Sequence, residues 1–134
     1  MKKLLLLTLF SLFVFTSFSQ KPNLDSLWAV WEDENQPDSN RLRAIDNFSF
    51  NYLRIQPDSA FYFAQFYLDY AEEKGHRDQM ASALNTQGIS FYYRGDYPKT
   101  IDYFTRSLSI KEEIGDKKGV AQSLNNIGNI YKAK

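Results

Sequence analysis

Apolar and small residues recur along this chain with the spacing of one helix face. Ala81, Leu84, Gly88 and Phe91 follow one another at intervals of three, four and three residues, which places them on one side of a helix with about 3.6 residues per turn. No segment alternates apolar and polar residues over the length of a strand, so no strand is expected. We therefore predict an all-α chain. The predicted helices lie near 24–34, 41–55, 57–74, 77–94, 97–114 and 117–133.

Glycines and prolines mark the ends of the predicted helices. Gly75, Gly95 and Gly115 each follow a periodic stretch, where a residue without a Cβ can adopt the left-handed conformation that ends a helix. Pro57 and Pro98 stand in first turns, where the missing N–H costs nothing. These residues thus agree with the periodicity.

Gly88 and Gly128 lie within predicted helices. A side chain there would hold two packed helices apart, so we expect both glycines at close helix–helix contacts.

Short polar side chains are the predicted helix caps. Asp96 and Asp116 precede two helices and can accept hydrogen bonds from their first free N–H groups. For the helix at 41–55, Ser39 or Asn40 of the preceding polar loop is the predicted cap. That helix carries a stripe of five apolar residues: Leu42, Ile45, Phe48, Tyr52 and Ile55.

The sequence repeats itself after 40 residues. Residues 68–94 and 108–134 share eight identities in 27 positions, where ordinary composition gives about two by chance. The identical pairs are Leu68/Leu108, Glu72/Glu112, Glu73/Glu113, Gly75/Gly115, Ala81/Ala121, Leu84/Leu124, Asn85/Asn125 and Gly88/Gly128. A period of this length indicates stacked helix pairs, each of which buries its apolar face against its neighbours.

The first residues have the layout of a secretory signal peptide. Lys2 and Lys3 precede an uncharged apolar run at 4–18, and the small residues of 17–19 provide a cleavage site before Gln20. The run has 15 residues, fewer than the roughly 20 that a membrane-spanning helix needs. We expect an exported, periplasmic protein that starts at Gln20. An anchor that is not cleaved is the alternative.

The stretch 81–114 resembles the tetratricopeptide repeat (TPR). The matching positions are Leu84 for the pattern's Trp, Gly88 for its Gly, Phe91 for its Tyr, 95–97 for its interhelix turn and Phe104 for its second-helix Phe. Thr100 departs from the usual Ala, and no Pro closes the repeat near Glu112. The period exceeds the usual length of about 34 residues and is typical of a long variant of this family.

The resemblance implies antiparallel helix pairs wound into a right-handed superhelical solenoid. We divide the chain accordingly. The predicted parts are a signal peptide at 1–19, a short helix and polar loop at 20–40, a degenerate TPR-like pair at 41–75, a TPR at 77–115 and the first helix of a truncated TPR at 117–134.

The last predicted helix is expected to lack a covering partner. Lys134 aligns with Arg94, one residue before the interhelix turn, so we expect a fragment of a longer protein. A small natural protein that pairs this face with a second copy is the alternative. We expect the last helix either to fray or to self-associate. The uncovered face consists of Leu124, Ile127 and Tyr131.

Composition argues against most catalytic chemistry. The chain has no Cys, a single His and 16 basic against 16 acidic residues. Thiolate chemistry, disulfides and multi-histidine metal sites are therefore excluded, and no net field favours nucleic acid. His76 is expected in solvent, as are the carboxylates of 72–73 and 112–113. We expect no enzyme activity, no cofactor, no metal and, after signal cleavage, no membrane contact.

The resemblance also implies a binding surface, because the first helix of each TPR lines a concave groove. The corresponding residues are Asn85, Ile89, Tyr92, Tyr93, Asn125, Asn126, Asn129 and Lys132. Asn side chains can pair with a peptide backbone, and Tyr offers flat contact area. Alternatively, the two tyrosines pack on a neighbouring helix. Ile89 and Tyr92 interrupt the cationic set that the family's carboxylate clamp requires.

The predicted function is that of an exported, non-catalytic scaffold. It would bind a protein or an extended peptide in this groove and form the N-terminal part of a larger protein. The alternative is the sensor region of a signalling protein, because an exported start followed by long TPRs resembles Bacteroidetes-type receptors. Their output module is a histidine kinase, a nucleotide cyclase or a DNA-binding regulator.

Overall fold

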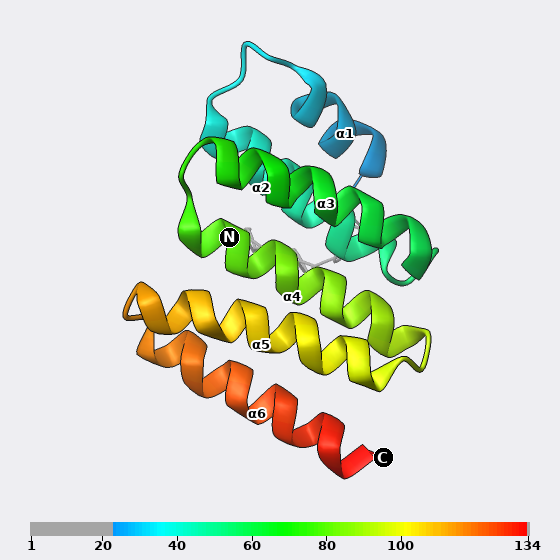
Figure 1. Cartoon of the computed structure of the whole chain (residues 1–134). Helices are drawn as coiled ribbons and strands as arrows, with labels where there is room; N and C mark the ends of the chain where they lie inside the picture. The colour runs from blue at the N-terminus through cyan, green and yellow to red at the C-terminus, as the bar shows by residue number, and fades with distance from the viewer. Residues whose placement is uncertain (1–22, 134) are drawn as a thin grey trace, which may run out of the picture.

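The computed structural model describes residues 23–133, which form six helices stacked in chain order, each antiparallel to the next (Figure 1). The helices are α1 (Leu24–Glu32), α2 (Asp38–Tyr52), α3 (Pro57–Glu73), α4 (Arg77–Tyr93), α5 (Tyr97–Glu113) and α6 (Lys117–Ala133). These residues contain no strand, so the prediction of an all-α fold is confirmed for this part of the chain. The predicted signal peptide at 1–19 lies outside the described residues.

The three predicted glycine helix ends are confirmed. Gly75, Gly95 and Gly115 have φ values of 74°, 76° and 72°, a conformation in which a side chain would be strained. After the first of them, the N–H of His76 donates to the carbonyl of Ala71 at 2.9 Å. This bond closes the helix end and turns the chain back into α4.

Two of the predicted caps are also confirmed. The carboxylate of Asp96 accepts a hydrogen bond from the N–H of Lys99 at 3.1 Å. The carboxylate of Asp116 accepts one from the N–H of Gly119 at 2.9 Å. Helices α5 and α6 therefore begin where the sequence predicts, because their first free N–H groups find a local acceptor.

The predicted start of α2 is wrong. The helix begins at Asp38, three residues earlier than expected, and neither Ser39 nor Asn40 caps it. Instead, the carbonyl of Pro37 accepts hydrogen bonds from the N–H groups of Asn40 at 2.9 Å and Arg41 at 3.1 Å. Proline fixes the entry angle, so the helix starts directly behind it.

The predicted end of α2 is also wrong, because the helix ends earlier in the sequence than expected. The helix ends at Tyr52, and Ile55, expected in the apolar stripe, is 60% exposed. Leu53 takes the buried place and is 3% exposed. The helix stops early because the chain must form a turn before Pro57, whose ring disfavours a helical conformation in the residue that precedes it.

The main apolar core lies between α2, α3 and α4. Its buried members are Leu42, Ile45, Phe48, Tyr67, Leu68, Tyr70, Ala71, Ala83 and Leu84. Helix α1 closes this core from the N-terminal side. The ring of Trp28 lies 5.0 Å from that of Phe48, and the ring of Trp31 lies 5.2 Å from that of Tyr70. Aromatic contacts of this kind carry much of the packing energy.

The contacts that α4 makes with α3 and with α5 use small and polar residues. Ser90 donates to the carbonyl of Pro57 at 2.8 Å, and Ser107 donates to the carbonyl of Ala81 at 2.7 Å. Each hydroxyl is buried and satisfied by a backbone carbonyl of a neighbouring helix. These side chains allow the helices to approach closely.

Helix α6 packs on α5 and ends the described stack. Ile130 is 6% exposed. Leu124 and Tyr131 are more than half exposed, and Ile127 is half-buried. Among residues 23–133, no helix is long and apolar enough to cross a membrane.

Candidate functional site

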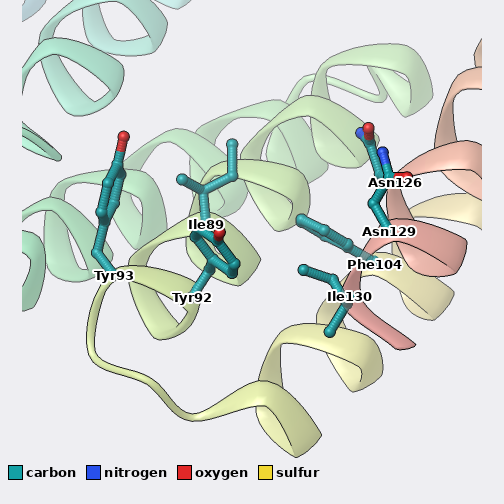
Figure 2. A pocket seen from close by; sticks show the side chains of 7 residues that line it. All are labelled: Ile89, Tyr92, Tyr93, Phe104, Asn126, Asn129 and Ile130. Carbon is teal, nitrogen blue, oxygen red and sulfur yellow. The ribbon is translucent and has the colours of Figure 1, made fainter. Parts of the chain in front are cut away.

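A groove of about 300 Å³ lies between α4 and α6, with α5 beneath it. Seven residues line it: Ile89, Tyr92, Tyr93, Phe104, Asn126, Asn129 and Ile130. Figure 2 shows Ile89 and Tyr92 of α4 facing Phe104 and Ile130 across the groove. The two asparagines stand on α6 along the opposite side.

The floor of the groove depends on a close contact between α4 and α5. A Cβ atom at Gly88 would lie 2.6 Å from Cδ1 and 2.7 Å from Cε1 of Phe104. The absence of a side chain at Gly88 therefore lets the Phe104 ring pass under α4 and reach the groove. The predicted tight helix contact at Gly88 is confirmed.

Gly128, the matching residue of the next repeat, has no such contact among residues 23–133, and the expectation for it stays a prediction. A Cβ atom there would meet nothing within 4 Å. Helix α6 packs only on α5 among the described helices, so no second helix approaches this glycine. Among the described helices, α4 and α5 are thus the pair that makes a close contact at this repeat position.

The α4 side of the groove carries two exposed tyrosines. Tyr92 is 41% exposed and Tyr93 is 54% exposed, so each ring presents part of its surface to solvent beside the groove. The ring of Tyr92 lies 5.8 Å from that of Tyr97 and 6.0 Å from that of Tyr93. This small aromatic cluster holds the Tyr92 ring in place at the end of α4, which reduces the entropy lost on binding.

The α6 side presents free amide groups. Asn126 and Asn129 are both exposed, and their side chains form no hydrogen bond to any of residues 23–133. Each amide retains donors and an acceptor. The groove thus combines an apolar floor with a polar edge and contains no charged side chain among its lining residues.

The structure brings five of the eight predicted residues into the groove and leaves three outside it. Asn85 is half-buried on α4, whereas Asn125 and Lys132 are exposed on α6 away from the lining. Asn125 lies about 100° around α6 from Asn126 and falls outside the lining of the groove. Whether the other five bind a ligand remains a prediction.

Sequence reasoning missed two lining residues, Phe104 and Ile130. Both are almost fully buried, at 5% and 6% exposed, and periodicity alone assigns such residues to the core. The signal that could have found the first is Gly88, because a glycine opposite a large aromatic ring indicates that the ring passes beneath it.

The charged groups singled out in the sequence lie on the surface. His76 and the carboxylates of 72–73 and 112–113 are exposed. Within the part of the chain that the structure describes, no three His, Cys, Asp or Glu residues gather in a way that could hold a metal ion. Burial raises the pKa of a different carboxyl group, that of Asp46 on α2.

Residues 79–134 match a family model described as tetratricopeptide repeat. The match takes in nearly all of α4, all of α5 and α6, and every residue that lines the groove. It confirms the resemblance for this part of the chain, a domain type that is generally a protein-binding scaffold, and it does not extend to 41–75. A search of curated proteins finds no match to the chain.

Proposed function

We propose that this chain is a non-catalytic scaffold that binds an extended segment of a partner protein in the groove between α4 and α6. The observation that carries the proposal is the groove itself, where an apolar floor lies beside two unpaired amides. Its position within the TPR match at 79–134 adds support.

The floor and the edge have different tasks in this proposal. Ile89, Phe104 and Ile130 accept one apolar side chain of the ligand. Burial of a leucine or phenylalanine side chain contributes about 1.5–3 kcal/mol, enough to act as an anchor. Asn126 and Asn129 pair with the ligand backbone and fix its direction, since an amide both donates and accepts hydrogen bonds.

The charge of the groove restricts which part of a partner fits. None of the lining residues is cationic, so the α-carboxylate of a chain terminus would lose solvation without gaining a cationic partner. The groove therefore suits an internal segment with an apolar residue better than a free C-terminus.

Selection from a library of displayed linear peptides tests this proposal. Peptides selected on the wild-type protein should share an apolar anchor residue. Their affinity should fall about tenfold or more for the Ile89→Asp variant, because a carboxylate on the groove floor must be desolvated by the ligand.

Two tyrosine variants provide a matched control. Tyr93→Ala alters the groove, whereas Tyr62→Ala removes an equally large ring that is 66% exposed on α3. The selected peptides should bind more weakly to the first variant and with unchanged affinity to the second. Equal affinity for the wild type, Ile89→Asp and Tyr93→Ala would show that the peptides bind elsewhere.

We also propose that the protein is exported and that its mature form is periplasmic and begins at or near Gln20. The layout of residues 1–19 supports this proposal. Mass analysis of the N-terminus of protein purified from its own host tests it. An intact Met1 in the membrane fraction would contradict it.

A further inference from the structure

A second cleft, of about 350 Å³, lies between α1 and α2. Asp25, Trp28 and Glu32 line it from α1, and Phe48 and Tyr52 line it from α2. Two carboxylates therefore stand beside three aromatic rings. Neither carboxylate has an ion-pair partner among residues 23–133.

The chain contains a corresponding cleft between α3 and α4. Asp58, Phe61 and Tyr62 line it from α3 with the same spacing that Asp25, Trp28 and Ala29 have in α1. Both clefts therefore place an acid one turn before an aromatic residue on the same helix face.

The cleft between α3 and α4 contains two cations of this chain, Arg94 and Lys99. Arg94 lies 2.6 Å from the carboxylate of Asp58, and its guanidinium carbon lies 4.2 Å from the centre of the Phe91 ring. The acid and the ring together hold one guanidinium group, as their charge and quadrupole favour.

The cleft between α1 and α2 lacks both of these cations. Tyr52, near the end of α2, supplies the ring that Phe91 supplies near the end of α4. Arg94 follows Phe91 by three residues, whereas Ile55 follows Tyr52 by three residues. The acid and the rings are thus present without the arginine that completes the other cleft.

The position of Glu32 strengthens this argument. Glu32 is the last residue of α1, where the carbonyl end of the helix already carries partial negative charge. A carboxylate there is locally unfavourable unless a cation approaches it. A positively charged ligand in the cleft would remove this repulsion.

A neighbouring position on α1 shows that this helix can bind a guanidinium. The Arg41 guanidinium lies 5.1 Å from the centre of the Trp31 ring and 4.6 Å from that of Tyr70. Its Nε donates to the carbonyl of Trp31 at 2.9 Å. An arginine from this chain thus packs against Trp31, whereas no arginine of residues 23–133 lines the cleft beside Trp28, one turn earlier on α1.

We propose that the cleft between α1 and α2 receives an arginine side chain of a partner protein. The guanidinium stacks on Trp28 or Tyr52 and pairs with Asp25, as Arg94 does with Phe91 and Asp58, while Glu32 adds negative potential. Arginine suits the site better than lysine because its planar group stacks and donates in two directions. The inference rests on the proposed function only in that a protein supplies the arginine.

The two tryptophans of the chain, Trp28 and Trp31, make the test direct. Their two indole N–H signals are followed by NMR in the full chain while a blocked Gly-Arg-Gly peptide is added. The Trp28 signal should shift saturably, and the Trp31 signal should stay in place. A peptide with neutral citrulline instead of arginine should shift neither signal.

Variants of the two acids complete the test. Asp25→Asn combined with Glu32→Gln should weaken binding of the arginine peptide about tenfold or more, and added salt should weaken it in the wild type. An equal Trp28 shift with citrulline, or full binding by the double variant, would overturn the proposal.

Two further measurements separate this proposal from the others. Tyr93→Ala should leave the Trp28 shift unchanged, since the groove between α4 and α6 is a different site. Sedimentation of the chain alone should show that the double variant does not alter its mass. A dimer that the double variant dissolves would place an arginine of a second copy in the cleft and overturn the assignment to a partner protein.

Discussion

The second helices of the pairs α2–α3 and α4–α5 each carry a large buried aromatic residue. The two aromatic residues occupy repeat positions that differ by one helical turn. In α3, Ala64 is followed three residues later by Tyr67, and both are fully buried. In α5, Phe104 is followed three residues later by Ser107, and both are buried as well. The small and the large residue have exchanged places.

This exchange decides whether the space above each pair is filled. Tyr67 belongs to the core formed by α2, α3 and α4, and its hydroxyl donates to the side chain of Gln79 on α4. Helices α2 and α4 are in contact. In the first pair, the Tyr67 ring therefore lies in the core where α2 and α4 meet.

The second pair leaves the corresponding space open. Phe104 lies against Gly88 and forms the floor of the groove, while Ser107 turns to a backbone carbonyl of α4. Among the described helices, α4 and α6 are not in contact. The groove therefore depends on the position of the large aromatic residue in the second helix of the pair. The repeated helix pair by itself does not produce it.

Removal of the Tyr67 ring should have the largest effect on stability. Tyr67→Ala deletes a fully buried aromatic ring and should lower the free energy of unfolding by about 3–5 kcal/mol. The control Tyr62→Ala removes a mostly exposed ring and should change it by less than about 0.5 kcal/mol. Urea unfolding measures both. Similar losses would show that Tyr67 does not fill the space between α2 and α4.

The paired glycines sharpen the comparison within the repeats. Gly88→Ala would force the Phe104 ring to move and should cost about 1–3 kcal/mol. Gly128→Ala meets no atom within 4 Å and should instead stabilise α6 by about 0.5–1 kcal/mol. Thermal unfolding distinguishes the two signs. A stabilising Gly88→Ala would contradict the close contact that forms the groove floor.

The smallest predicted effect on stability comes from the burial of Asp46 on α2, whose charge interacts with Tyr67. Burial raises the pKa of Asp46, so its protonated form is the one that the fold favours. The stability it contributes is present below its unfolded pKa of about 3.9 and is lost as pH rises through the folded value. Asp46→Asn should therefore raise the melting temperature near neutral pH. At about pH 3, wild type and variant should melt alike, and a gain of equal size at both pH values would contradict this assignment.

Periodicity and glycine placement were sufficient to predict the six helices, because each helix follows from residues close together in the chain. The ends of α2 were the exception. There, Pro37 and Pro57 set the boundaries against the apolar pattern that suggested Ile55. The local geometry at the two prolines determined the ends of α2, and Ile55, the last residue of the predicted stripe, stayed exposed.

The site was less predictable than the fold. The tyrosines and asparagines of the groove follow from their register, but Phe104 and Ile130 reach it only because α4, α5 and α6 meet there. The cleft between α1 and α2 was not predicted either. Its acids and rings come from separate helices, and only the contact of α1 with α2 brings them together.

The most direct test of the account is the location of a bound peptide. A peptide selected on the wild-type protein is added to isotope-labelled chain, and the amide and side-chain signals are followed by NMR. We expect shifts concentrated at Ile89, Tyr93, Asn126 and Asn129, with the signals of residues between α2 and α4 unchanged. Shifts confined to α2 and α3, with these four residues unaffected, would contradict the claim that the open space beside Phe104 is the binding site.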